Sequence, residues 1–291
     1  MTPREQEILL LTCHLGDPDR KPLSPAQMRK LLQRAGERIP RSETEWMHLG
    51  YSARDAAYIC MLLGQTEQLD WYVRRGKKRG CVPITRDDPA YPQRLLRRLG
   101  LECPGSLWTK GDISILDRPC VALVGSRELD SRNANFAIEA GKQAACQGYV
   151  LVSGNARGAD QAAQESCLFH GGKVISVVAD QLEDCPKHKN ILYIAENGFD
   201  LPFAAYRALS RNRIIHCLPS VTLVAQCAKG KGGTWDGTVK NLKYGWSPVF
   251  CLDDGSDGMQ ALCDLGADAI ALGQLADISA LRPAVAGMFS D

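Results

Sequence analysis

Cations, glycines and small polar residues gather at four places in this sequence of 291 residues. The four groups are, in chain order, Gly125, Ser126 and Arg127; Gly154, Arg157 and Gly158; Arg211, Asn212 and Arg213; and Lys231, Gly232, Gly233 and Thr234. Glycine lets backbone N–H groups approach a ligand closely, and the arginine fork matches two phosphate oxygens at once. These residue types predict a site for anions, and for phosphate groups above all.

The first two groups follow short apolar runs at 120–124 and 149–153. Each run ends at a glycine and is followed by a helical pattern, which is typical of the strand–turn–helix units of a parallel sheet. The carboxyl ends of parallel strands meet at one edge of the sheet, where the next helices present their positive ends. We therefore expect the two groups to lie together at that edge.

The alternation of strands and helices continues along the chain. Strands are predicted near 120–124, 149–153, 173–178, 220–226, 248–252 and 268–271. Helices are predicted near 131–147, 158–170, 187–197, 206–218, 236–245 and 256–265. This order predicts an α/β fold with a doubly wound, Rossmann-like parallel sheet over 120–285.

The chain before this region is predicted to be helical over 3–75. Ser24, followed by Pro25, and Ser52 both have the residue type and position of helix N-caps. We therefore predict a helical domain at 1–75 and a connecting segment with short strands at 76–119.

The amino-acid composition indicates which broad class of protein this is. The content of 45% hydrophobic and 23% charged residues is that of a soluble globular protein, and no apolar run approaches the ~18 residues of a membrane helix. The start of the chain does not resemble a signal peptide. The twelve cysteines include no Cys-x-x-Cys pair, so we expect buried, reduced thiols and a cytoplasmic location.

The charge is unevenly distributed. Residues 1–110 carry 19 Lys and Arg against 13 Asp and Glu, a net charge of +6, whereas residues 111–291 carry a net charge of −4. Five cations lie within the six residues 74–79. We interpret this run as a solvated edge between domains, with a nucleic-acid contact as the alternative.

Several residues in the four groups keep alternative interpretations. Arg211 and Arg213 cannot share one helical face, so either one reaches the site while the other pairs internally, or both face the ligand from a frayed helix start. Asp160 is interpreted as a cap or arginine partner rather than a general base. Trp235 either stacks on a base or packs in the core.

Known cofactor and catalytic motifs are missing. The turn at Gly125 lacks the Gly-x-Gly-x-x-Gly of dinucleotide sites, the loop at Lys231 is not a Walker A loop, and the five histidines have no metal-ligand spacing. The sequence therefore predicts no cofactor, no metal ion and no catalytic residue, but a cationic sheet edge with little acid.

These motifs resemble those of the DNA-processing DprA (Smf) family. The matching segments are Val-Gly-Ser-Arg at 124–127, Ser-Gly-x-Ala-Arg-Gly-x-Asp at 153–160, Gly-Gly-Lys-x-Ile at 171–175, the pair Pro186 and Asn190, and Arg-Asn-Arg-Ile-Ile at 211–215. Upstream, Asp88-Pro-x-Tyr-Pro and Lys110-Gly-Asp112 resemble the family's lead-in. The resemblance covers about 80–273, and residues 1–75 are compatible with the helical, SAM-like module that precedes it.

The resemblance implies an extended Rossmann fold that binds single-stranded DNA without sequence preference and is not an enzyme. It also implies a homodimer that hands the strand to RecA during transformation or recombination. The sequence departs from the family in the loop 231–237, in Val-Ala-Gln at 224–226, and in having no winged-helix segment after residue 285. A divergent or defence-associated relative is therefore a further possibility.

Two rival functions belong to other classes. A nucleotide-binding or phosphoribohydrolase-like protein would be similar at Gly232-Gly233-Thr234, but Gly237 stands where that family has its catalytic glutamate, and Asp236 is one residue away. A pure interaction scaffold could use the basic N-terminal third.

Overall fold

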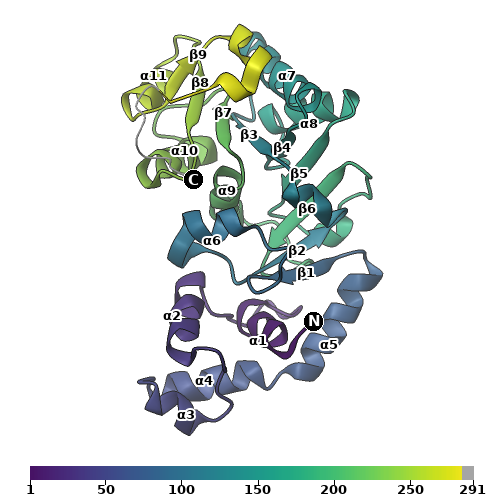
Figure 1. Ribbon diagram of the computed structural model, residues 1–291, viewed down its shortest axis with the longest axis vertical. Helices are drawn as coiled ribbons and strands as arrows, with labels where there is room; N and C mark the ends of the chain where they lie inside the picture. Colours follow the sequence, from purple (N-terminus) through teal and green to yellow (C-terminus); the bar gives the residue numbers. More distant parts are fainter. Residues whose placement is uncertain (284–291) are drawn as a thin grey trace.

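A single mixed sheet organises the protein, a computed structural model of which describes residues 1–283 (Figure 1). Within those residues the sheet has nine strands in the order β1-β2-β6-β5-β4-β3-β7-β8-β9. Their bounds are β1 Val82–Thr85, β2 Ser106–Lys110, β3 Cys120–Val124, β4 Val150–Ser153, β5 Lys173–Val177, β6 Ile191–Glu196, β7 Val221–Val224, β8 Val249–Leu252 and β9 Asp268–Ile270. Strands β3 to β9 are mutually parallel, whereas β1 and β2 extend the edge beside β6 in antiparallel pairing.

Helices cover both faces of this sheet, as Figure 1 shows. One face carries α7 (Ser131–Cys146) and α8 (Ala159–Phe169), and the other carries α9 (Ala205–Cys217), α10 (Gly232–Tyr244) and α11 (Asp257–Asp264). Helix α6 (Gln93–Leu99) packs against α9. The short helices are η1 Gly100–Glu102, η2 Ile113–Asp117, η3 Leu182–Asp184 and η4 Leu272–Ala280. The predicted Rossmann-like α/β fold is confirmed.

The two halves of the sheet separate between β3 and β7. The chain leaves β3 through α7 on one face and leaves β7 through α10 on the other, although the two strands are hydrogen-bonded neighbours. Loops that diverge in this way open a crevice at the carboxyl ends of the strands, which is where α/β proteins bind their ligands. Two of the four cationic groups follow these two strands.

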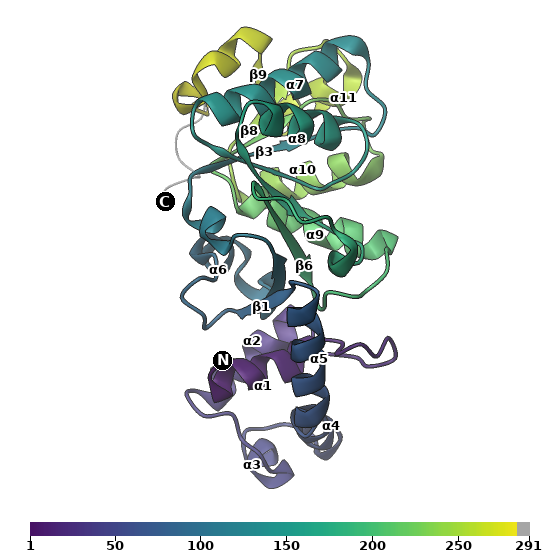
Figure 2. The same ribbon diagram turned by 90° about the vertical axis from the view of Figure 1, so that its right-hand side faces the viewer.

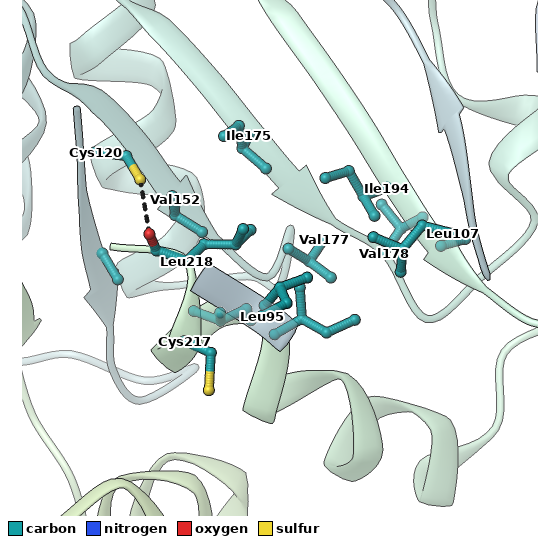
Figure 3. Close-up of a cluster of buried hydrophobic side chains, with 14 of the residues drawn as sticks. Leu95, Leu107, Cys120, Val152, Ile175, Val177, Val178, Ile194, Cys217 and Leu218 are labelled. Carbon is teal, nitrogen blue, oxygen red and sulfur yellow. Dashed lines mark hydrogen bonds between the residues drawn. The ribbon is translucent and has the colours of Figure 1, made fainter. Parts of the chain in front are cut away.

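The core beneath this crevice is formed by buried aliphatic side chains from strands and helices far apart in the sequence (Figure 3). Val152 and Ile175 of neighbouring strands face Leu95 of α6 and the end of α9 at Leu218. The Cys120 thiol donates a hydrogen bond to the Leu218 carbonyl at 3.2 Å. A packed floor of this kind fixes the strand ends above it.

The helix predicted at 187–197 is wrong. That segment forms the strand β6, in which every residue is buried. A short apolar run such as Ile191-Leu-Tyr-Ile-Ala is ambiguous between strand and helix, and its β-branched and aromatic residues favour a strand that is covered on both faces. The connecting segment supplies β1 and β2, in agreement with the short strands expected there.

The N-terminal part is helical, as predicted, with α1 Pro3–Thr12, α2 Pro25–Ala35, α3 Glu43–His48, α4 Ala53–Leu63 and α5 Thr66–Lys78. Ser24 and Ser52 are the N-caps of α2 and α4: their side chains accept the backbone N–H of Gln27 and Asp55. Helix α5 runs three residues past 75 without a break. The domain boundaries at 75, 119 and 285 stay predictions, and the last one, with the expectation about a winged helix, lies outside the described residues.

Other expectations from composition can be compared with the described residues. All twelve cysteines are free; eight are buried, and Cys146 is exposed, in contrast to its expected burial. Over residues 1–283 no helix combines the length and apolarity needed to cross a membrane. Nor does that part of the chain gather three or more His, Cys, Asp or Glu side chains in a way that could hold a metal ion.

Candidate functional site

A pocket of about 550 Å³ opens at the carboxyl ends of β3 and β7. Its walls are the β3–α7 turn, the start of α10 and one side of α9. Nine of the thirteen predicted site residues line it: Gly125, Ser126, Arg127, Arg211, Asn212, Lys231, Gly232, Gly233 and Thr234. The fold therefore joins three of the four groups at one place.

The β3–α7 turn is held on two sides by backbone hydrogen bonds. The Ser126 N–H donates to the Gln226 carbonyl at 2.9 Å, and the Ser126 carbonyl accepts the Ala159 N–H at 3.1 Å. A Cβ on Gly125 would lie 2.4 Å from the Ala159 Cβ, so only glycine fits between the strand and α8. The Arg127 side chain is left exposed at the mouth of the pocket.

Asp160 organises the neighbouring β4–α8 turn. Its carboxylate accepts the N–H groups of Gly154 at 3.0 Å and Ala156 at 3.2 Å. Burial raises the pKa of the Asp160 carboxyl, while Arg211 and the two amides act in the opposite direction. Gly158 has φ +80° and packs on the Ser126 carbonyl, so it shapes the turn rather than lining the pocket. Asp160 is thus a turn cap beside an arginine.

Arg211 is the side chain that joins the strand ends. Its Nη1 donates to the carbonyl oxygens of Gly154 and Val177, at the ends of β4 and β5. Burial lowers the pKa of the Arg211 guanidinium, and the Asp160 carboxylate opposes that shift. The guanidinium lies so close to the β4–α8 turn that a Cβ on Gly154 would approach Nη1 to 2.4 Å. Arg211 therefore supports the pocket wall as well as contributing positive charge.

The loop before α10 closes the other wall. The Thr234 hydroxyl donates to the Gly125 carbonyl at 2.8 Å, and the Asn212 amide donates to the Gly233 carbonyl at 3.0 Å. Gly232 has φ +83°, a backbone conformation that would be strained in a residue with a side chain. It is the first residue of α10, and the N-cap residue of this helix, Lys231, makes no side-chain capping hydrogen bond. The first N–H groups of α10 and the exposed Lys231 thus border the pocket.

Arg213 does not reach the pocket. Its guanidinium pairs with the Glu196 carboxylate at 2.5 Å and donates to the carbonyl oxygens of Glu102 and Ser210. The two arginines of α9 point in different directions, as their spacing requires. Of the two alternatives, the structure therefore shows the one in which Arg211 lies at the site and Arg213 pairs internally.

A second pocket of about 660 Å³ adjoins the first. The two share Arg127, Ala156, Phe203, Ala208 and Arg211 as lining residues, and the second adds Gly154 and Arg157 of the predicted set. It also contains the carboxylates of Asp180 and Asp184, so the expectation of little acid holds for the first pocket but not for the second. Together the two pockets form one trough.

Phe203 is a site residue that the sequence reasoning missed. It is 54% exposed and lies where the two pockets meet. The sequence offered a weak signal, because the aromatic residue directly follows Pro202 in the short segment that precedes α9. Trp235, which was considered for stacking, is partly buried against the core instead.

Three cations of the trough have no carboxylate partner among residues 1–283. Arg127, Arg157 and Lys231 are exposed, and none lies within 4.0 Å of an acidic oxygen in the described part of the chain. Three exposed cations beside the uncapped N-terminus of α10 suit an anionic ligand that is longer than one phosphate.

Comparison with known proteins places this site in a family. The model of the family "DNA recombination-mediator protein A" matches residues 83–280. The chain belongs to that family. It is 32% identical to the DNA processing protein DprA of Streptococcus pneumoniae over 187 residues and 28% identical to the protein Smf of Escherichia coli over 160 residues. It spans 66% and 42% of the lengths of these two relatives.

Solved structures of recombination-mediator protein A relatives share the fold. The X-ray structure of DprA from S. pneumoniae matches 87% of this chain and 96% of its own, with a TM-score of 0.64 at 24% identity. A structure of DprA from Helicobacter pylori, described as giving insight into a unique single-stranded DNA binding mode, matches 67% of this chain and 94% of its own, with a TM-score of 0.56 at 25% identity. The resemblance seen in the sequence motifs is confirmed.

Proposed function

We propose that this protein binds single-stranded DNA in the trough formed by the two pockets. The observation that carries the proposal is the placement of Arg127, Arg157 and Lys231 around the trough: all three are exposed, and none forms an ion pair with an acidic side chain within residues 1–283. A strand presents one phosphate per nucleotide, so several separate cation sites can hold it at once. Family membership and the single-stranded DNA binding of the H. pylori relative support the same ligand.

The trough fits binding without sequence readout. The exposed cations of its lining, Arg127, Arg157 and Lys231, recognise phosphates rather than base edges. Phe203 supplies an aromatic face at the junction of the pockets, and base–aromatic stacking tolerates every base. We expect little preference among homopolymers, and a strong dependence of affinity on salt.

The test compares Arg127→Ala with wild type by anisotropy of a labelled oligothymidylate at two salt concentrations. Hydrogen bonds to charged groups contribute about 1.5–3 kcal/mol, so we expect the affinity to fall at least tenfold. Arg118→Ala is the matched control, because Arg118 is exposed just before the amino end of β3, whereas Arg127 follows its carboxyl end. The proposal would be refuted if wild type and Arg127→Ala bound with equal affinity, or if the affinity did not depend on the salt concentration.

The other parts of the proposed function rest on family membership. They are a role in transformation or recombination, a homodimer, transfer of the strand to a RecA-type recombinase, a cytoplasmic location, and the absence of catalysis. Light scattering at tens of micromolar tests the dimer: a monomer would contradict it. A pull-down with RecA in the presence and absence of the strand tests the transfer.

A nucleotide-cleaving enzyme finds less support. Asp236 would be its general acid or base, but its carboxylate is paired with Lys240 at 2.8 Å and does not line either pocket. Gly237, at the position of the catalytic glutamate, packs toward His216. Turnover of a nucleoside monophosphate that is abolished by Asp236→Ala would reverse this judgement.

A further inference from the structure

Helix α5 of the N-terminal part is docked beside the second pocket by one row of arginines. Arg75 pairs with Glu183 at 3.0 Å and with Asp200 at 2.7 Å, and Arg79, one helical turn later, pairs with Glu183 at 3.4 Å. Glu183 belongs to η3, next to Asp184 of the second pocket. These ion pairs fix the orientation of α5 relative to the trough.

A second row of cations runs along α5 next to the docked row. Arg74 and Lys78 each precede one of the anchoring arginines, so they lie one turn apart and about 100° further round the helix. Both are exposed, and within residues 1–283 neither has a carboxylate within 4.0 Å. Arg74 and Lys78 are called the α5 basic row below. Pairing with protein acids therefore does not account for them.

A hollow lies between the end of α5 and the second pocket. It has a volume of about 470 Å³ and shares Pro186 with that pocket. Gly80, just after α5, forms one side, and Lys187 and Lys189 form the other; a Cβ on Gly80 would lie 3.8 Å from the Lys187 Cε. Its one carboxylate lining residue, Asp112, is bridged to Lys173 at 3.8 Å.

The carboxylates of the second pocket make the hollow a more favourable place for the backbone of a bound strand. Asp180 and Asp184 repel phosphates, so a backbone leaving the trough is disfavoured beside them and favoured where cations outnumber carboxylates. Lys187 and Lys189 supply that positive surface beyond Pro186, and the α5 basic row stands on the last turns of the helix that ends two residues before Gly80 of the hollow. The end of α5 lies beside strand β1 at this edge of the sheet, in both views of the molecule (Figure 1 and Figure 2).

We propose that a long single strand continues from the trough over the 186–189 loop and contacts the α5 basic row, so that the N-terminal helical part is a second backbone-binding surface. The inference rests on the proposed function of the trough. It assigns two separate tasks to four of the five cations in the run 74–79: Arg75 and Arg79 dock the helix, and Arg74 and Lys78 hold phosphates.

The experiment uses the full chain and the double variant Arg74→Ala/Lys78→Ala. Its matched control is Lys30→Ala/Arg54→Ala, which removes one lysine and one arginine from exposed positions of α2 and α4 in the same part of the protein. Affinities are measured for oligothymidylates of about 6 and about 25 nucleotides, lengths chosen to fill the trough alone or to extend past it.

For the long oligonucleotide, the double variant is expected to lose about three- to tenfold in affinity. The slope of log affinity against log salt should fall by about 1.4, because each phosphate contact contributes about 0.7 for single strands. The short oligonucleotide should bind all three proteins equally. The inference would be overturned if the double variant bound the long oligonucleotide with the affinity and the salt slope of wild type. An equal loss of affinity in the control variant would overturn it as well. If Arg127→Ala leaves both lengths unaffected, the proposed function itself fails instead.

Discussion

His216 should make the stability of the protein fall on acidification. Its side chain is buried at the wall of the first pocket, and its Nδ1 accepts the Asn241 amide N–H at 3.1 Å. The Asn241 carbonyl oxygen accepts the Ser247 N–H at 2.9 Å, which fixes the amide with its nitrogen toward the ring. Nδ1 therefore carries no proton, and burial lowers the pKa of His216 from 6.5 to about 4.

The sign of the effect follows from which state binds the proton first. Because the folded pKa is depressed, the unfolded chain takes up the proton near pH 6.5, whereas the folded protein resists it until about pH 4. The stabilising contribution is fully present above pH 6.5 and is lost as the pH falls toward 4. Between pH 7.5 and pH 5 this amounts to about 2 kcal/mol, and the full shift amounts to about 3 kcal/mol.

The measurement is urea unfolding of wild type and His216→Gln at several values between pH 7.5 and pH 5. A matched variant is needed because Asp160 acts in the opposite direction: burial raises its folded pKa, so it adds stability as the pH falls through that pKa. The difference between the two proteins isolates the histidine. If both lose the same stability over this range, the reasoning that the ring is buried and neutral is wrong.

Two further predictions concern the trough. Phe203→Ala should weaken single-stranded DNA binding by about 1–3 kcal/mol if one base stacks there, whereas Phe169→Ala, at an exposed position near the end of α8, should not change the affinity in the same anisotropy titration. Gly154→Ala should lower the thermal unfolding midpoint, because the added Cβ would lie 2.4 Å from the Arg211 Nη1, while Gly273→Ala, which meets nothing within 4 Å, should leave it unchanged.

The sequence predicted the central fold well because its signals are local. The strands β3, β4, β5, β7 and β8 are mainly apolar runs that end near a turn signal, and segments of helical length separate them. Strand β6 was predicted as a helix because its place in the sheet depends on pairing with β2 along one side and with β5 along the other. The β-branched and aromatic residues of 191–196 favour a strand, but the run itself does not identify those neighbours.

The site was predicted as a set of motifs, but the roles of its members depend on tertiary contacts. Arg211 and Arg213 look equivalent in sequence; only the fold brings Glu196 to one and the carbonyls of Gly154 and Val177 to the other. Phe203 belongs to no motif; it lines both pockets, three residues after Asp200, which pairs with Arg75 of α5. Residue type predicted the charge of the site but not the partner of each charge.

The cations of the trough are of two kinds, one buried and the other exposed. Arg211 donates hydrogen bonds to backbone carbonyl oxygens and lies beside the Asp160 carboxylate, so its charge is largely compensated within the protein. Arg127, Arg157 and Lys231 are exposed to water, and none forms an ion pair with an acidic side chain within residues 1–283. Only the second kind can release counterions when a polyanion binds, so only its loss should reduce the salt slope, whereas loss of Arg211 should reduce stability first.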